Sequence, residues 1–213
     1  MGGRWLALLL VLVLAGCSRV IDDARPRAET PVAPIAAGQV ADLLSKRVRR
    51  GNDGNLFVTV EPQRCAGVAR EVDSPFVFDA KPVAHDGGHW DAGGGRSPSI
   101  EEMVGVYRAD FDAAGAIERA AHDIESCRDQ TMTVTAMRGE VIDARLLPQV
   151  ASGSPRIVFW SFAARSWACD NAFVAAHNAA IEITACAATN GYDVATLARD
   201  ALARIETLAN RVA

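Results

Sequence analysis

The five cysteines are the residues whose chemistry can be placed most directly. Cys17 follows two small residues that close an apolar run from Trp5 to Leu14, and Arg4 puts a positive charge before that run. The run is far shorter than the ~20 residues of a membrane-spanning helix. This pattern is typical of a secretory signal cleaved before a cysteine that carries a lipid. We predict a signal peptide over residues 1–16 and lipidation at Cys17, which would anchor the protein to the cell membrane at its extracytoplasmic face.

The other four cysteines would enter an oxidising compartment after export, and their even number predicts two disulfides. They are Cys65, Cys127, Cys169 and Cys186. Four cysteines allow three pairings, and the count alone does not choose among them. The chain has no Cys-x-x-Cys motif, which argues against a zinc ribbon or a thioredoxin-like site.

The segment between Cys169 and Cys186 narrows the choice of pairing. Its midpoint falls between His177 and Asn178, so a symmetric hairpin with this two-residue turn places the two cysteines directly opposite each other. In this register one face is apolar and carries Ala172, Val174, Ile181, Ile183 and Ala185, while the other carries Asn171, Glu182 and Thr184. Opposed strand residues lie within disulfide reach. We therefore predict Cys169–Cys186 and, by elimination, Cys65–Cys127.

Two histidines beside carboxylates come closest to a metal-ligand set. His85 and His89 stand with Asp86 and Asp91, but the glycines around them argue against a helix that would bring both imidazoles together. We expect residues 79–99 to form a mobile polar surface loop, with no metal and no cofactor.

No side chain stands out as catalytic. His122 and Cys127 are five residues apart on a predicted helix and face different ways, and the thiol is expected to be oxidised. The nucleophile and metal motifs Gly-x-Ser-x-Gly, Ser-x-x-Lys and His-Glu-x-x-His are absent. An Asp–Glu pair of the glycosidase kind stays open, because nothing in the sequence selects such a pair.

Three tryptophans and two arginines are the candidates for a binding cleft: Trp90, Arg108, Trp160, Arg165 and Trp167. Aromatic faces with a few cations suit glycans, lipid head groups or other small envelope molecules. The competing interpretation is core packing for the tryptophans and solvated strand ends for the arginines.

The length and charge of the chain restrict its partners and its domain count. The chain has 213 residues and a formal charge of −4. Cleavage before Cys17 would leave 21 basic and 26 acidic residues, a net charge of −5, so no nucleic-acid partner is expected. The proline-containing residues 17–37 are predicted to be a lipidated tether, and residues 38–213 one folded domain.

The elements expected within this domain are mixed. We predict a helix from Gln39 that ends in the basic run of residues 46–50, which is a solvated helix end or, alternatively, a membrane-facing patch. Amphipathic helices follow the capping residues Asp112 and Asp193, and the first of them buries Cys127. Strands are expected over residues 56–60, 104–107, 132–136, 141–147 and 156–167. The expected fold is α+β, an antiparallel sheet packed against amphipathic helices with two disulfides.

These features together resemble a known family. Cys65-Ala66-Gly67 follows a short helix, Cys127 ends a helix, and Trp167, Cys169 and Asn178 lead into the run Ile181–Ala187 before a terminal amphipathic helix. Over residues 38–213 the pattern is similar to the extracellular sensor domain of mycobacterial PknH-like receptor kinases and of the lipoproteins that carry it. The resemblance implies the same disulfide pairing, a polar-lined cleft for an unknown ligand, and no catalytic residues.

We therefore expect a non-catalytic, lipid-anchored sensor or ligand-binding lipoprotein of the cell envelope. Without a kinase domain of its own, it would carry a small envelope ligand or pass a signal to a membrane protein partner. Two alternatives remain, an envelope hydrolase or transferase and a structural lipoprotein that docks a partner. The first predicts convergent titratable groups in a cleft, and the second predicts an exposed apolar patch.

Overall fold

The computed structural model describes residues 33–49, 55–92 and 98–210. Its elements in chain order are η1 Ala37–Leu43, β1 Phe57–Glu61, η2 Gln63–Cys65, α2 Ala66–Ala69, α3 Pro75–Phe78, β2 Ala84–Asp91, β3 Ser99–Val106, α4 Ala113–Ser126, β4 Thr131–Ala136, β5 Val141–Leu146, β6 Ile157–Ala163, β7 Ala168–Ala176, β8 Ala179–Ala187 and α5 Val194–Ala209. The predicted signal peptide and Cys17 lie outside the described residues. Within those residues, no helix is long and apolar enough to cross a membrane.

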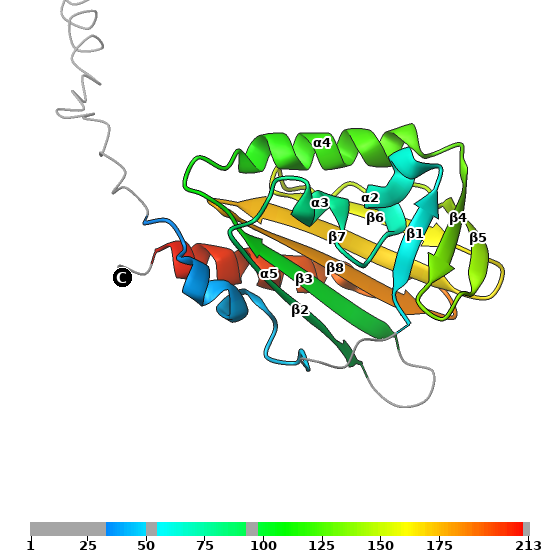
Figure 1. Ribbon diagram of the computed structural model, residues 1–213, viewed down its shortest axis with the longest axis horizontal. Helices are drawn as coiled ribbons and strands as arrows, with labels where there is room; N and C mark the ends of the chain where they lie inside the picture. Colours follow the sequence, from blue (N-terminus) through cyan, green and yellow to red (C-terminus); the bar gives the residue numbers. More distant parts are fainter. Residues whose placement is uncertain (1–32, 50–54, 93–97, 211–213) are drawn as a thin grey trace, which may run out of the picture. The chain divides into compact units, whose positions relative to one another are not determined.

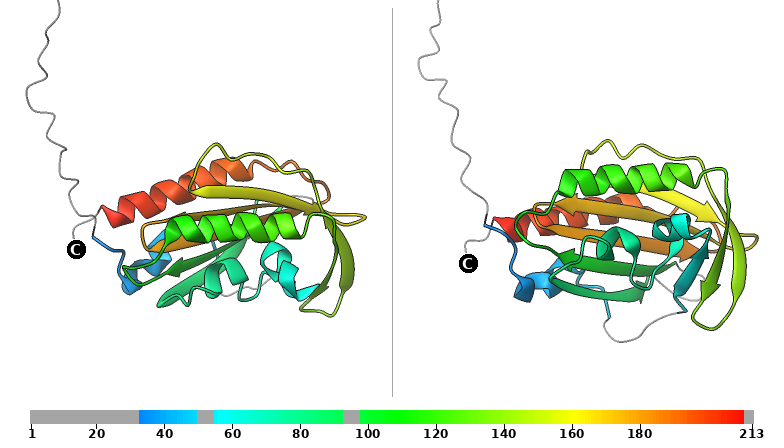
Figure 2. Two further views of the ribbon diagram at one scale, coloured as in Figure 1. Left: turned by 90° about the horizontal axis from the view of Figure 1, so that it is seen from above. Right: turned by 45° about the horizontal axis from the view of Figure 1, so that its top comes forward.

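The strands form one antiparallel sheet in the order β1-β4-β5-β6-β7-β8-β3-β2 (Figure 1). Helix α4 and the short helices α2 and α3 cover one face, and α5 lies across the other (Figure 2). Because both faces are covered, every residue of β7 is buried. The α+β fold with helices packed on an antiparallel sheet is confirmed.

Both long helices begin where the sequence places them. The Asp112 side chain accepts a hydrogen bond from the Gly115 amide at 2.9 Å, and Asp193 accepts one from Thr196 at 3.0 Å. Aliphatic residues at helical spacing then face the sheet from each helix. Cys127, which ends α4, is fully buried as predicted.

The β7–β8 hairpin has the predicted register, with Cys169 opposite Cys186. The disulfides are Cys65–Cys127 and Cys169–Cys186, so the predicted pairing is confirmed. The left-handed turn residue is His177, with φ 51°, rather than Asn178. The Asn178 side chain instead accepts from the Ile35 amide and donates to the carbonyls of Ile35 and Tyr107, each at 2.9 Å. Ile35, which precedes Ala37, therefore belongs to the packed domain.

Two expected elements differ from the observed ones. The predicted loop over residues 79–99 contains β2, an edge strand that pairs along its full length with β3. Its glycines hid the strand pattern, yet one serves close packing, because a Cβ on Gly88 would lie 2.8 Å from the Arg49 carbonyl oxygen. The predicted helix over residues 39–50 ends at Leu43 as a 3-10 helix, since the next residue turns to extended backbone. We call residues 44–49, which include a turn at Lys46 and Arg47, the strap.

Candidate functional site

The five predicted ligand-binding residues do not converge. Trp90 is 5% exposed and packs in the core beneath α5, whereas Trp160 is 2% exposed and packs in the core beneath α4. The Trp160 indole donates to the Val68 carbonyl at 2.8 Å. Because the two tryptophans lie on opposite faces of the sheet, they cannot line one cleft.

The other three candidates are scattered as well. Trp167 is half-buried and stacks on Phe57 at a centroid distance of 5.2 Å. Arg165 is exposed, and Arg108 forms a solvated pair with Asp110 at 3.7 Å. These positions agree with packing and solvation rather than with a shared binding surface.

The histidines of the predicted loop lie on β2. The His85 ring contacts Phe78 edge-on at 4.9 Å, and His89 Nδ1 lies 4.0 Å from Glu101 Oε1. The described part of the chain holds no group of three His, Cys, Asp or Glu side chains with the geometry of a metal site. Cys127, whose pairing with His122 was considered for thiol chemistry, is held in a disulfide.

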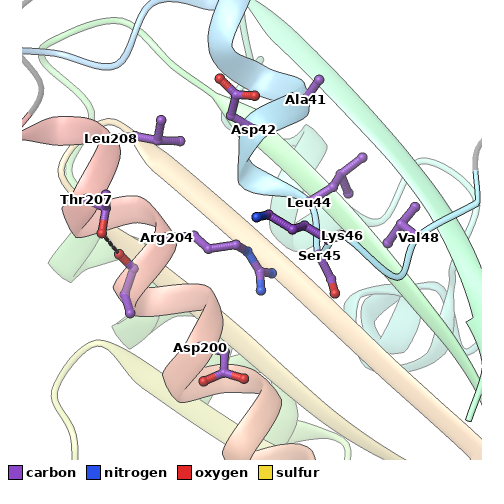
Figure 3. A pocket seen from close by; sticks show the side chains of 11 residues that line it. Ala41, Asp42, Leu44, Ser45, Lys46, Val48, Asp200, Arg204, Thr207 and Leu208 are labelled. Carbon is purple, nitrogen blue, oxygen red and sulfur yellow. Dashed lines mark hydrogen bonds between the residues drawn. The ribbon is translucent and has the colours of Figure 1, made fainter.

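A large hollow lies between η1 and the strap on one side and α5 on the other (Figure 3). We call it the strap groove. It has a volume of about 690 Å³, in the range of small-molecule sites. Its lining consists of Ala41, Asp42, Leu44, Ser45, Lys46, Val48, Asp200, Ala203, Arg204, Thr207 and Leu208.

A buried ion pair fixes the floor of the strap groove. Arg204 donates to both carboxylate oxygens of Glu102, at 3.0 and 3.1 Å, and its Nε donates to the Leu43 carbonyl at 2.7 Å. Glu102 Oε2 also accepts from the Ser45 amide at 2.7 Å. The Glu102 side chain is fully buried and that of Arg204 is 22% exposed. One guanidinium therefore joins α5, β3 and the chain that enters the strap.

The electrostatics of this pair depend on its donors. Burial raises the pKa of Glu102, while the Arg204 guanidinium and the Ser45 amide oppose that rise. Three hydrogen bonds donated to one carboxyl group suit its ionised form. The pair thus serves as a rigid, charge-compensated base for the groove.

The walls above this floor are mixed in character. Leu44, Val48 and Leu208 supply apolar surface, and Asp42 and Asp200 stand at the two ends. Lys46 extends from the strap toward Arg204 on the opposite wall (Figure 3). Such a groove can hold a molecule with an apolar part and a charged or hydrogen-bonding head.

A second, smaller hollow lies on the α4 side of the sheet, and we call it the carboxyl pocket. It has a volume of about 30 Å³ and is lined by Leu56, Glu71, Ser74, Glu101, Glu102, Met103, Glu182 and Thr184. Burial raises the pKa of both Glu71 and Glu182 to about 8. These are convergent titratable groups, as the hydrolase alternative requires, but the volume admits about one water molecule and no sugar or acyl group.

The sequence analysis named Lys46, Glu182 and Thr184 for other reasons and did not predict either hollow. Neither Arg204 nor Glu102 was singled out from the sequence. The available signal was a glutamate between Ile100 and Val104 at the two-residue period of a strand that faces the core. Nothing in the sequence linked that glutamate to an arginine about a hundred residues further along the chain.

The protein is an α+β domain with two disulfides, a combination typical of proteins exported to an oxidising compartment. The chain belongs to the PknH-like extracellular domain family, whose model matches residues 31–204. The predicted resemblance is thereby confirmed, and the domain is an extracytoplasmic one of the sensor type.

Among solved structures, the chain is similar to the extracellular domain of PknH from Mycobacterium tuberculosis. The sequence identity is 18% and the TM-score is 0.66, and the match covers 82% of this chain and 98% of that chain. At this low identity, the structural match shows a shared fold and nothing more. The search of curated proteins gave no match.

Proposed function

We propose that the protein is a non-catalytic, lipid-anchored lipoprotein that binds a small envelope molecule in the strap groove. The groove carries this proposal, because it combines a volume suited to small molecules with a rigid floor at Glu102 and Arg204. Family membership supports placement outside the cytoplasm. The signal sequence and Cys17 support the lipid anchor.

The groove favours an amphipathic ligand with an acidic or hydroxylated head. Lys46 offers three N–H donors and a positive charge at the strap, whereas the charge of the neighbouring Arg204 is compensated by Glu102. Leu44, Val48 and Leu208 would cover an acyl or other apolar portion. Asp42 and Asp200 at the ends of the groove disfavour a ligand with a second anionic group there.

The absence of catalysis rests on the chemistry of the groove lining. Three hydrogen bonds, two from Arg204 and one from the Ser45 amide, hold the Glu102 carboxyl group at the floor, so it is not placed to move a proton to a bound molecule. The carboxyl pocket has acids with raised pKa values, but its volume excludes a substrate. Binding is therefore the activity that the geometry supports.

Native mass spectrometry of the full chain, purified from the membranes of a mycobacterial host, tests the proposal. We expect a covalent lipid mass that survives denaturation and a second, non-covalent mass that is lost. Replacing Ala203 with Trp should fill the groove and remove the second mass alone. Arg199→Trp is the matched control, because Arg199 is exposed on the same helix but does not line the groove.

The outcomes separate the two parts of the proposal. A Cys17→Ala protein that still carries the covalent lipid would refute the anchor. A wild-type protein without a non-covalent mass, or an Ala203→Trp protein that keeps it, would refute binding in the strap groove.

A further inference from the structure

The carboxyl pocket joins three separate parts of the chain. Glu71 and Ser74 come from the segment of residues 70–79, which runs from the end of α2 through α3. Glu101 comes from β3 and Glu182 from β8. The pocket thus lies at the contact between the 70–79 segment and the sheet.

Two of the attachments of this segment run through carboxyl groups. The Ser74 hydroxyl donates to Glu182 Oε2, and Glu71 Oε2 accepts from the Phe57 amide at 2.7 Å. Glu182 is 6% exposed, and Ser74 is also buried. These bonds fix both ends of the connection between α2 and α3.

The remaining attachments of the segment are apolar or neutral. Phe76 meets the rings of Trp160 and Phe173 at 5.5 and 5.7 Å, and Val77 is buried. The Tyr107 hydroxyl donates to the Val77 carbonyl at 2.6 Å. These contacts are insensitive to pH over the range in which carboxyl groups titrate, because burial raises the pKa of Tyr107 above its ordinary value of 10.

Three acidic side chains, those of Glu71, Glu101 and Glu182, line the pocket. Glu71 faces Glu101 and Glu182, and both neighbours raise its pKa further. Glu102 points away from the pocket to Arg204 on the other face of the sheet. His89 lies beside Glu101, and the Arg70 guanidinium donates to the Val72 carbonyl at 2.7 Å. Ionisation of Glu71 and Glu182 would therefore place like charges close together where hydration is reduced.

We propose that Glu71, Ser74 and Glu182 form a proton-operated latch that holds the 70–79 segment on the sheet. The latch is closed while both carboxyl groups are protonated. Loss of the protons puts two anions beside Glu101, and release of the segment relieves this by returning the carboxylates to water. An exported domain meets the pH of its surroundings directly, so the latch would make the conformation of this segment depend on external pH.

The direction of the response follows from proton binding. The released carboxyl groups have a pKa near the ordinary 4.5, and the latched ones have a pKa of about 8. Between these values the closed state binds more protons than the open one, so acid favours closure and rising pH favours opening. The opening constant should rise tenfold per pH unit for each carboxyl released, hence up to a hundredfold for two.

Hydrogen exchange of the full, disulfide-bonded chain between pH 5.5 and pH 7.5, corrected for intrinsic exchange, measures this directly. The amides of Phe57, Val72 and Phe78 report the segment, since each is hydrogen-bonded in the latched form. Amides of α5 serve as the internal reference. We expect opening near Phe57 and Phe78 to rise at least tenfold per pH unit, with little change in α5.

Matched variants identify the groups responsible. Glu182→Gln and Glu71→Gln should each lower the pH slope by about a factor of ten per unit, and the double variant should show none. Glu118→Gln, an exposed change on α4, should leave the slope as in the wild type. A flat wild-type profile, an equal slope in α5, or a slope that persists in the double variant would each overturn the latch. None of these results depends on whether the strap groove binds a ligand.

Discussion

Two glutamates on neighbouring strands of one sheet meet opposite conditions. Glu102 of β3 pairs with Ile183 of β8, and Glu182 of β8 pairs with Met103 of β3. Glu102 points to the α5 face, where a guanidinium and an amide donate to it. Glu182 points to the α4 face, where a single hydroxyl donates to it. Burial alone therefore does not decide the role of a carboxyl group.

The partners of each carboxyl explain the difference between the two faces. A cation and a backbone amide offset the loss of hydration at Glu102, and the result is a rigid junction between strap, sheet and helix. A lone hydroxyl offsets little at Glu182, so its pKa rises to about 8 and the group stays protonated at neutral pH. The α4 face, which carries these less compensated acids, is also the face that is closed by the disulfides.

The largest effect is expected on the α4 face, from removal of the Cys65–Cys127 bridge. The double change of Cys65 and Cys127 to Ser should lower the free energy of unfolding by about 4 kcal/mol, from the entropy of a loop spanning 62 residues. The corresponding change at Cys169 and Cys186, with a separation of 17, should cost about 3 kcal/mol. Denaturant unfolding under oxidising conditions measures both. Equal losses of stability for the two bridges would show that loop entropy does not decide which bridge contributes more.

Breaking the ion pair tests the α5 face. Arg204→Met should cost about 3 kcal/mol, because it leaves the buried Glu102 carboxylate without its cation. Adding Glu102→Leu should recover most of that loss, since no uncompensated charge remains. Urea unfolding of the two single variants and the double variant gives the coupling. If Arg204→Met alone is neutral, Glu102 is not held as an anion.

More of the fold than of these sites could be predicted from the sequence. Cys169 and Cys186 could be paired because hairpin symmetry is local and follows from a period of two. The caps at Asp112 and Asp193 are local for the same reason. The Glu102–Arg204 and Ser74–Glu182 contacts each join residues about a hundred positions apart, and no periodicity encodes which distant partner a buried carboxyl meets. Strand β2 was missed because two glycines interrupt its hydrophobic pattern, and one of them, Gly88, packs closely against Val48 and Arg49 of the strap.

Replacing each glutamate with glutamine should change the free energy of unfolding in opposite directions at the two positions. Glu102→Gln should destabilise the protein by about 1–2 kcal/mol at neutral pH, since it weakens hydrogen bonds to a charged group. The wild type should lose stability as pH rises from 4.5 towards 8, because the pKa of Glu182 is raised in the folded state. Glu182→Gln removes this loss, so the stability of the variant relative to the wild type should be higher at pH 8 than at pH 5. Thermal unfolding across this pH range measures both. The same sign for the two variants at pH 8 would contradict the contrast.

The smallest effect is expected at the start of α4. Asp112→Ala removes the acceptor for the Gly115 amide and should cost about 1 kcal/mol. Asp112→Asn should retain most of the stability, because an amide oxygen can accept the same bond. The Cys65–Cys127 bridge holds the opposite end of the helix, so the loss should appear as fraying of its first turn rather than as release of α4 from the sheet. Hydrogen exchange along α4 distinguishes these results. Exchange that rises over the whole helix, Cys127 included, would mean that the bridge does not hold the α4 face independently of the cap.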